Sequence, residues 1–219
     1  MSKTAIVLGG TGLTGGFLLK KLLDDPSYDR IKLFSRSSSN IKHEKIEEYI
    51  VDLFGLNENS EHFKGDVVFS CIGTTKSKTP DELLYRKIDY GIAVAAAELC
   101  KQNDIGTFIV VSALGANPNS AIFYNKTKGE MERDVLKLQL AHCYILQPSL
   151  IGGKRLEKRF GERLAQVLLG LFDFLVPKEY KMIHPETIAD AMIWLANHPY
   201  PEVRISSNKI KKIALNDRD

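Results

Sequence analysis

The chain has 219 residues, 44% of them hydrophobic and 26% charged, which is the composition of an ordinary globular protein with a full hydrophobic core. Thirty basic residues against 27 acidic ones leave a formal charge of +3, which is too small to indicate a nucleic-acid partner. The three cysteines have no C-x-x-C spacing, and Gly170 and Asp173 interrupt the longest apolar segment, so neither a disulfide framework nor a membrane span is predicted.

The first predicted element is a buried strand, Thr4 to Leu8, which leads through a glycine-rich turn into a helix that ends near Asp25. The glycines fit two patterns, since Gly12 and Gly15 can be counted with Gly10 as G-x-G-x-x-G or with Gly9 as G-x-x-G-x-x-G. In both, one glycine permits the turn, the middle one lets a pyrophosphate approach the backbone, and the last lets the helix pack closely on the strand. A phosphate site at the start of the helix is therefore predicted.

The second and third predicted strands, Ile31 to Arg36 and Glu47 to Val51, each end at a residue relevant to a dinucleotide. In such a fold the residue after the second strand lies beside the adenosine ribose, where an acidic residue suits a 2′-hydroxyl and an arginine suits a 2′-phosphate. Arg36 therefore favours NADP(H) over NAD(H), although a solvated arginine is the alternative. Asp52 either meets the adenine amino group or caps the next turn.

Strands and helices continue to alternate, and Gly73, Thr74 and Thr75 leave the fourth strand at the edge of the sheet where a dinucleotide passes. The alternation predicts an α/β fold: one Rossmann-like domain over residues 1–219, with a doubly wound parallel sheet and helices on both faces. The remaining predictions in this region are a strand and its exit loop at 66–75, a helical stretch at 80–102, a strand at 107–111, a helix at 121–140 and a strand at 141–146.

After residue 151 the alternation loosens, and a small C-terminal helical region is expected, with residues 151–183 contributing a substrate pocket. Phe160 to Leu175 has apolar residues at helical spacing on more than one face. Such a helix packs in the core, covers a pocket or contacts a partner subunit, and core packing is favoured. Pro185 to Asn197 is predicted as a helix and Lys209 to Leu215 as an edge strand.

Tyr124 and Lys128 are four residues apart on one predicted helix, so they lie on the same face, and Ser112 ends a strand at the same edge of the sheet. A serine hydroxyl, a phenol and an ammonium are the groups needed for hydride transfer to or from a carbonyl carbon. A phenol with a pKa of about 10 is poorly matched to proton transfer at neutral pH. The neighbouring ammonium and a positive nicotinamide would lower that pKa.

These stretches resemble the short-chain dehydrogenase/reductases, and within their atypical branch the Tat-interacting-protein oxidoreductases. The resemblance covers most of the chain. It is carried by Gly9 to Gly16, Cys71 to Lys76, Val111 to Ala116, Tyr124 to Glu130 and Gln147 to Leu150.

The resemblance implies catalytic roles for three residues: Ser112 would polarise the substrate carbonyl, Tyr124 would act as general acid or base, and Lys128 would bind the nicotinamide ribose and tune Tyr124. The implied cofactor-binding residues are Gly9, Thr11, Gly12, Leu13, Thr14, Gly15, Arg36, Asp52, Leu53, Gly73, Thr74, Thr75, Val111, Ser112, Tyr124, Lys128, Pro148, Ser149 and Ile151.

The chain departs from the family pattern at two positions. Gln147 stands where family members often have arginine, which puts a cation there in doubt. Asp89 replaces the asparagine that joins the catalytic set in many short-chain enzymes, so a proton relay through that position is not implied.

Two functions remain open on the sequence. The leading one is an NADP(H)-dependent oxidoreductase acting on a small carbonyl or alcohol, and the alternative is a non-catalytic, NADP(H)-sensing regulator that binds a protein partner. A homodimer is also left open, through the helix at 160–175. A metal hydrolase is disfavoured because the five histidines lack ligand-like spacing.

The cysteine usage suits a reducing compartment, and no signal peptide is predicted. A cytoplasmic protein without membrane or nucleic-acid partners is therefore expected.

Overall fold

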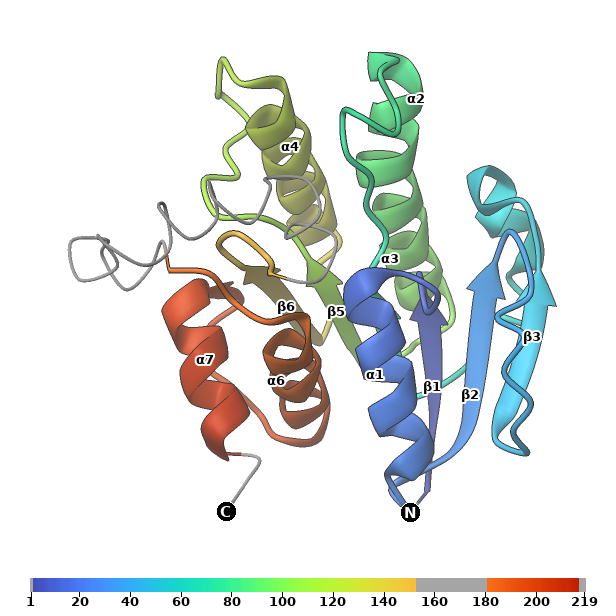
Figure 1. Cartoon of the computed structure of the whole chain (residues 1–219). Coiled ribbons are helices and arrows are strands. Elements are labelled where there is room, and N and C mark those ends of the chain that lie inside the picture. The colour runs from blue at the N-terminus through green and yellow to red at the C-terminus, as the bar shows by residue number, and fades with distance from the viewer. Residues whose placement is uncertain (1, 153–180, 217–219) are drawn as a thin grey trace, which may run out of the picture.

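The computed structural model describes residues 2–152 and 181–216 of the chain. These residues form a seven-stranded sheet with the strand order β3-β2-β1-β4-β5-β6-β7, in which every neighbouring pair is parallel (Figure 1). The predicted doubly wound Rossmann-like sheet is confirmed. The strands are β1 (Lys3–Leu8), β2 (Tyr28–Ser35), β3 (Ile46–Ile50), β4 (Val67–Ser70), β5 (Thr107–Val111), β6 (His142–Gln147) and β7 (Arg204–Ser206).

Helices cover both faces of the sheet, and each face has its own hydrophobic core (Figure 1). The described helices on one face are α1 (Leu13–Asp24), α6 (Pro185–Asn197) and α7 (Ser207–Asn216). The other face carries the 3-10 helix η1 (Leu53–Asn59) and the helices α3 (Ile92–Gln102) and α4 (Phe123–Lys137), with α2 (Glu82–Arg86) and the π-helical turn η2 (Lys87–Gly91) leading into α3.

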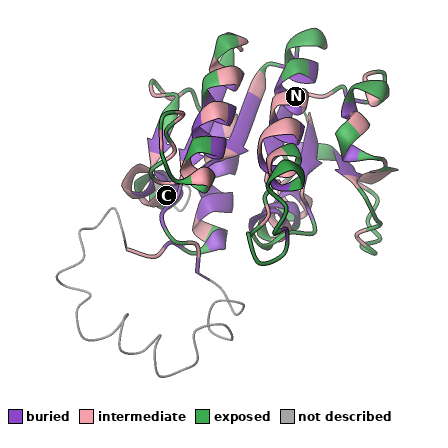
Figure 2. Cartoon of the chain, turned by 90° about the horizontal axis from the view of Figure 1, so that it is seen from above, coloured by how far each residue is buried: buried purple, intermediate pink, exposed green. Residues whose placement is uncertain are grey.

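The central strand β1 shows why the sheet forms. Ala5 and Val7 are buried in one core while Ile6 and Leu8 are buried in the other, as expected for a parallel strand that is covered on both faces. Figure 2 shows the same distribution for the molecule, with buried residues in the strands and on the inner sides of the helices. Because β1, β4 and β5 are parallel neighbours, their carboxyl ends meet at one edge of the sheet.

The C-terminal edge strand was predicted in the wrong place. Residues 209–215 lie in helix α7, and the edge strand is β7, which pairs in parallel with β6. The physical reason is the spacing of the buried side chains: Ile210, Ile213 and Ala214 recur at helical intervals and pack in the core. The actual strand has three residues, too few to show an alternating pattern.

The helical stretch predicted over residues 80–102 is interrupted. It begins at Glu82, and η2 separates α2 from α3. π-helical turns are uncommon and often occur at functional sites. Here the turn carries the buried Asp89.

The predicted helix at 160–175 and most of the predicted substrate region at 151–183 lie outside the described residues. None of the helices in the described ranges is long and apolar enough to cross a membrane.

Candidate active site

The turn between β1 and α1 requires glycine at two positions. Gly9 has a φ of +81°, and a Cβ atom there would lie 2.8 Å from the carbonyl oxygen of Cys71. A Cβ atom at Gly15 would lie 2.1 Å from the carbonyl oxygen of Gly9. At Gly10 the nearest atom would be a leucine side-chain carbon at 3.4 Å, an ordinary contact. Of the two glycine patterns, the structure therefore favours the one that starts at Gly9.

Helix α1 begins at this turn with its N-terminus uncapped. Gly12 is the cap residue, no side chain hydrogen-bonds the first turn, and that turn contains no acidic residue. Thr11 and Leu13 are exposed beside it, whereas Thr14 is buried. Free backbone N–H groups and the positive end of the helix dipole suit an anion such as a pyrophosphate. The local structure thus fits the phosphate site predicted for this turn.

Arg36 follows β2 directly, is exposed, and has no hydrogen bond or ion pair to another residue of the described ranges. The serines after it are held by Glu48 of β3, which accepts hydrogen bonds from the hydroxyl of Ser38 and the backbone N–H of Ser39, both at 2.7 Å. These bonds lower the pKa of the Glu48 carboxyl. The guanidinium of Arg36 is therefore available to an anion beside an ordered loop.

At the end of β3, the structure shows the capping alternative for Asp52. Its side chain accepts a hydrogen bond from the backbone N–H of Phe54 at 2.9 Å and caps η1. Leu53 points into the core and is buried.

Hydrogen bonds to Thr74 hold the loop that follows β4 in place. The backbone N–H of Thr74 donates to Oδ2 of Asp89 at 2.8 Å, and its carbonyl accepts from the hydroxyl of Tyr85 at 3.3 Å. Its side-chain hydroxyl pairs with that of Thr79 at 2.9 Å. Gly73 and Thr75 flank this anchored residue and are exposed at the carboxyl edge of the sheet.

Lys128 is buried on the inner face of α4. Its ammonium pairs with Oδ1 of Asp89 at 2.9 Å, and the two side chains are 4% and 1% exposed. It also reaches the carbonyl of Val111, at the end of β5, at 3.5 Å. Burial is the largest single influence and opposes the charge on Lys128, but Asp89, Tyr124 and Glu132 together raise the pKa of the ammonium.

Tyr124 lies on the same face of α4, one turn before Lys128, and is 39% exposed. Burial of the phenol raises the pKa of Tyr124, the Lys128 ammonium lowers it in part, and Asp89 raises it further. The net shift from the chain's own residues is upward, opposite to the lowered pKa expected from the sequence. The main reason is burial of the phenol, and Asp89, which the sequence did not place beside Lys128, offsets part of the ammonium charge.

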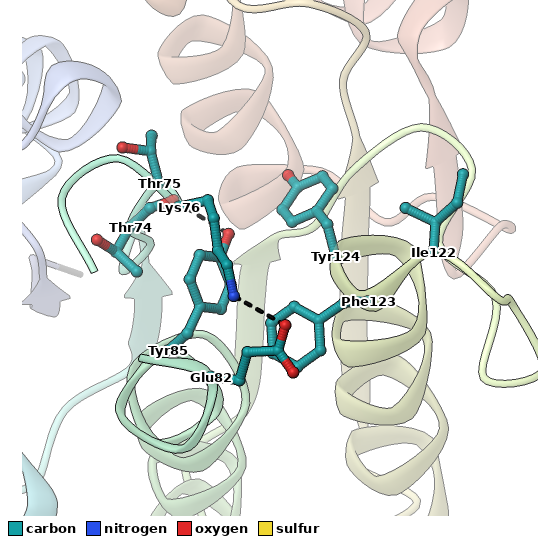
Figure 3. Close-up of a pocket in the computed structure, with 8 residues that line it drawn as sticks. All are labelled: Thr74, Thr75, Lys76, Glu82, Tyr85, Ile122, Phe123 and Tyr124. Carbon is teal, nitrogen blue, oxygen red and sulfur yellow. Dashed lines mark hydrogen bonds and ion pairs between the residues drawn. The ribbon is translucent and has the colours of Figure 1, made fainter. Parts of the chain in front are cut away.

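Tyr124 lines a pocket of about 420 Å³ at the carboxyl edge of the sheet (Figure 3). Phe123 and Tyr124 come from the start of α4, and Tyr85 and Glu82 come from α2 on the opposite side. The other lining residues are Thr74, Thr75, Lys76 and Ile122. The pocket has a largely apolar, aromatic wall, as small-molecule sites commonly do.

The polar groups at the mouth of this pocket contact one another. Lys76 forms an ion pair with Glu82 at 2.8 Å, and its ammonium lies 5.0 Å from the centre of the Phe123 ring. Tyr85 packs edge-on against the same ring. Sequence reasoning missed Tyr85, Glu82 and Phe123, because only the fold brings α2 opposite α4.

Ser112 is buried and is not among the residues that line the pocket. It donates to Oε1 of Glu132 at 2.5 Å, and no hydrogen bond joins it to Tyr124 within the described part of the chain. Glu132 is itself buried, two turns after Tyr124 on α4. The structure thus brings Tyr124 and Lys128 to one face, while the hydroxyl of Ser112 is directed to a carboxylate.

Two further groups bind this carboxylate. Nε2 of Gln147 donates to both oxygens of Glu132, at 2.9 and 3.1 Å, and Nε of Arg204 donates to Oε2 at 2.8 Å. Family members often have an arginine at position 147, and here Arg204 of β7 instead brings a cation to the Glu132 carboxylate. Glu132 could have been found in the sequence by following the face of Tyr124 and Lys128 one turn further, whereas no local pattern marks Arg204.

Three residues after β6 were predicted to bind the cofactor: Pro148 contacts the loop after β5, whereas Ser149 and Ile151 contact residues of the C-terminal region. The carbonyl of Pro148 accepts from the backbone N–H of Leu114, which follows β5. The Ser149 hydroxyl bonds the carbonyl of Lys181 at 2.6 Å and the hydroxyl of Ser207 at 2.9 Å. Ile151 forms an isolated bridge with residue 183. Ser149 therefore anchors α7 in this structure.

No group of three histidine, cysteine, aspartate or glutamate side chains in residues 2–152 and 181–216 is arranged to hold a metal ion.

Sequence comparison places the chain among known proteins. Residues 9–150 match the NAD(P)H-binding family. The chain is 33% identical over 171 residues to protein FMP52, mitochondrial, of Candida albicans, which covers 75% of each chain. It is 31% identical over 173 residues to protein HTATIP2 of Rattus norvegicus, which covers 77% of this chain and 71% of the relative.

The fungal relatives contradict the cytoplasmic location expected from the sequence. Their names describe mitochondrial proteins, in Candida albicans, Debaryomyces hansenii and Meyerozyma guilliermondii alike. Cysteine usage separates reducing from oxidising compartments but does not indicate which reducing compartment holds a protein.

Solved structures share the fold. MoeE5 in complex with UDP-glucuronic acid and NAD superposes with a TM-score of 0.70 at 17% identity, covering 97% of this chain and 81% of that one. A UDP-N-acetylglucosamine 4-epimerase from Methanobrevibacter ruminantium gives 0.69 at 20% identity, covering 94% and 76%. The family match and the two relatives show that the chain belongs to the NAD(P)H-binding family and is related to FMP52 and HTATIP2, and the glycine turn and the Tyr124–Lys128 face agree with this.

Proposed function

We propose that the protein is an NADP(H)-dependent oxidoreductase that interconverts a small carbonyl compound and its alcohol. The observation that carries the proposal is the phenol of Tyr124 in the wall of a pocket, one helical turn from the buried ammonium of Lys128. Both lie at the sheet edge where the glycine turn opens.

The chain's own residues fit the cofactor. Gly9, Gly12 and Gly15 permit the tight turn at the uncapped start of α1, which suits a pyrophosphate, and the exposed guanidinium of Arg36 suits a 2′-phosphate. Lys128 has one donor besides those directed at Asp89 and the Val111 carbonyl for a ribose hydroxyl. The nicotinamide, when bound, supplies or accepts the hydride.

Tyr124 is the proton donor in this proposal. Its raised pKa keeps the phenol protonated at neutral pH, so it can give its proton to the oxygen of a carbonyl that is being reduced. For Ser112 to polarise that carbonyl as well, its hydroxyl must turn from Glu132 to the substrate. The pocket of about 420 Å³, with its aromatic wall, suits a small, partly apolar substrate.

Replacing Tyr124 by phenylalanine tests the proposal. Oxidation of NADPH in the presence of a panel of aldehydes and ketones should fall at least a hundredfold, the scale of general acid catalysis, while NADPH affinity stays within about twofold. Tyr200→Phe is a matched control, because Tyr200 packs on Trp194 of α6, on the other face of the sheet. Undiminished turnover by Tyr124→Phe would contradict the assignment.

The alternative is a regulator that binds NADP(H) and meets a protein partner without turnover. One observation favours it: two of the three expected catalytic groups, Ser112 and Lys128, are engaged by buried carboxylates. The carbonyl panel separates the two functions, because a sensor oxidises NADPH with none of the compounds. A partner whose capture depends on NADPH would then support the regulator.

A further inference from the structure

Asp89 holds two groups of the site at once. One carboxylate oxygen pairs with the ammonium of Lys128 at 2.9 Å, and the other accepts the backbone N–H of Thr74 at 2.8 Å. Both charged side chains are nearly inaccessible to solvent, so water screens their attraction little. The π-helical turn η2 places Asp89 here, in the middle of an otherwise α-helical stretch.

The charged and titratable groups around Tyr124 come from three elements. Lys128 lies on α4, Asp89 on η2 and the Tyr85 phenol on α2. Glu132 acts on Lys128 from the next turn of α4. At the mouth of the pocket, Lys76 and Glu82 neutralise each other.

The effect of Lys128 on Tyr124 depends on its partner. A lone ammonium one turn away stabilises a phenolate and so favours loss of the phenol proton. A carboxylate in contact with that ammonium opposes the effect, because at the phenol the two fields have opposite signs.

We propose that Asp89 is a positioning residue that offsets the charge of Lys128 and thereby holds Tyr124 as a neutral proton donor. This inference rests on the proposed function for its chemical meaning. In carbonyl reduction the substrate carbon gains a hydride from the reduced nicotinamide and its oxygen gains the Tyr124 proton. The O–H bond of the phenol breaks, and the phenolate recovers a proton from water. A neutral phenol is the form that this direction requires.

The test needs no substrate. Protein labelled with ¹³C at Cζ of tyrosine is titrated by NMR, and Tyr124→Phe identifies the Tyr124 signal among the eight tyrosines. In the unmodified protein we expect the Tyr124 pKa to lie above the ordinary value of about 10. In Asp89→Asn, which keeps the shape of the side chain and its bond from Thr74, the Tyr124 pKa should fall, because the carboxylate that raises it is gone.

Two variants make the result specific. Asp134→Asn removes the same charge from α4, at a site that accepts from the Tyr90 hydroxyl at 3.0 Å, so it should shift the Tyr90 signal and leave that of Tyr124 unchanged. Adding Lys128→Met to Asp89→Asn should reverse the fall, because it removes the ammonium charge that Asp89 no longer offsets.

The proposal is overturned if Tyr124 titrates below about 10 in the unmodified protein, a measurement that holds even where Asp89→Asn fails to fold. It is also overturned if Asp89→Asn folds and leaves the Tyr124 pKa unchanged. A fall of the pKa without reduction of any carbonyl compound would refute the proposed function while supporting the role of Asp89. Where reduction is found, the alkaline limb of its pH profile should move to lower pH in Asp89→Asn.

Discussion

In the proposed function, cofactor choice depends on one residue, Arg36, whose guanidinium is exposed beside a loop that Glu48 keeps in place. We expect Arg36→Ala to weaken NADPH binding about tenfold or more, the value of one charge-assisted hydrogen bond, and to leave NADH binding nearly unchanged. Titration of both cofactors measures this. Arg30→Ala, an exposed arginine on the same strand, is the control. An equal loss for both cofactors would exclude contact with a 2′-phosphate.

Two glycines of the turn differ in the space that a side chain would have. Gly15→Ala places a methyl group 2.1 Å from a backbone oxygen that cannot move without opening the turn, whereas Gly10→Ala makes an ordinary contact. Although alanine favours helix, we expect Gly15→Ala to lower the free energy of unfolding by about 1–3 kcal/mol. Gly10→Ala should change it by less than about 1 kcal/mol. Urea unfolding of the two variants checks this, and equal stabilities would show that the turn adapts.

At the scale of elements, Glu132 joins helix α4 to three neighbouring strands, through Ser112 directly after β5, Gln147 at the end of β6 and Arg204 at the start of β7. Arg204→Leu leaves this buried carboxylate without its cation. Because the Arg204 side chain is 51% exposed and water can replace part of it, we expect a loss of about 1–2 kcal/mol in unfolding free energy.

The neighbouring amide offers a rescue for that loss. Nε2 of Gln147 already lies within hydrogen-bond distance of both carboxylate oxygens, so Gln147→Arg can supply a cation there. In urea unfolding, Arg204→Leu with Gln147→Arg should recover most of the stability lost in Arg204→Leu alone. No recovery would mean that Arg204 stabilises β7 by packing and not by its charge.

The elements also show how much of the fold and of the site can be predicted from the sequence. The strand at 107–111 and the helix at 185–197 were predicted with the bounds that the structure has, since the strand is a short apolar run with clear ends and the helix has a clear period. Tyr124 and Lys128 were placed correctly on one helical face by their spacing. Their partner Asp89 could not be placed beside them, because contact across two elements depends on the π-helical turn and on packing, and no local period records either.

At the scale of the whole molecule, the two cores and the site occupy different parts of the sheet. The cores fill both faces, while the glycine turn, Arg36, the loop at Thr74 and the start of α4 all lie at the carboxyl edge. These segments are far apart in the chain and come together only when the sheet forms. A ligand that needs them all therefore binds the folded state and not the unfolded chain.

Cofactor binding should for this reason stabilise the entire fold. At about 100 times the dissociation constant, NADPH adds about 2.7 kcal/mol to the free energy of unfolding, which for a chain of this size raises Tm by about 5–10 °C. Adenosine 2′,5′-bisphosphate, which lacks the nicotinamide, should give part of this rise if the adenosine end is held at Arg36. In Arg36→Ala the bisphosphate should lose its effect, and NADPH and NADH should raise Tm equally. If NADPH leaves Tm unchanged in the unmodified protein, the carboxyl edge does not hold the cofactor, and both the oxidoreductase and the sensor are excluded.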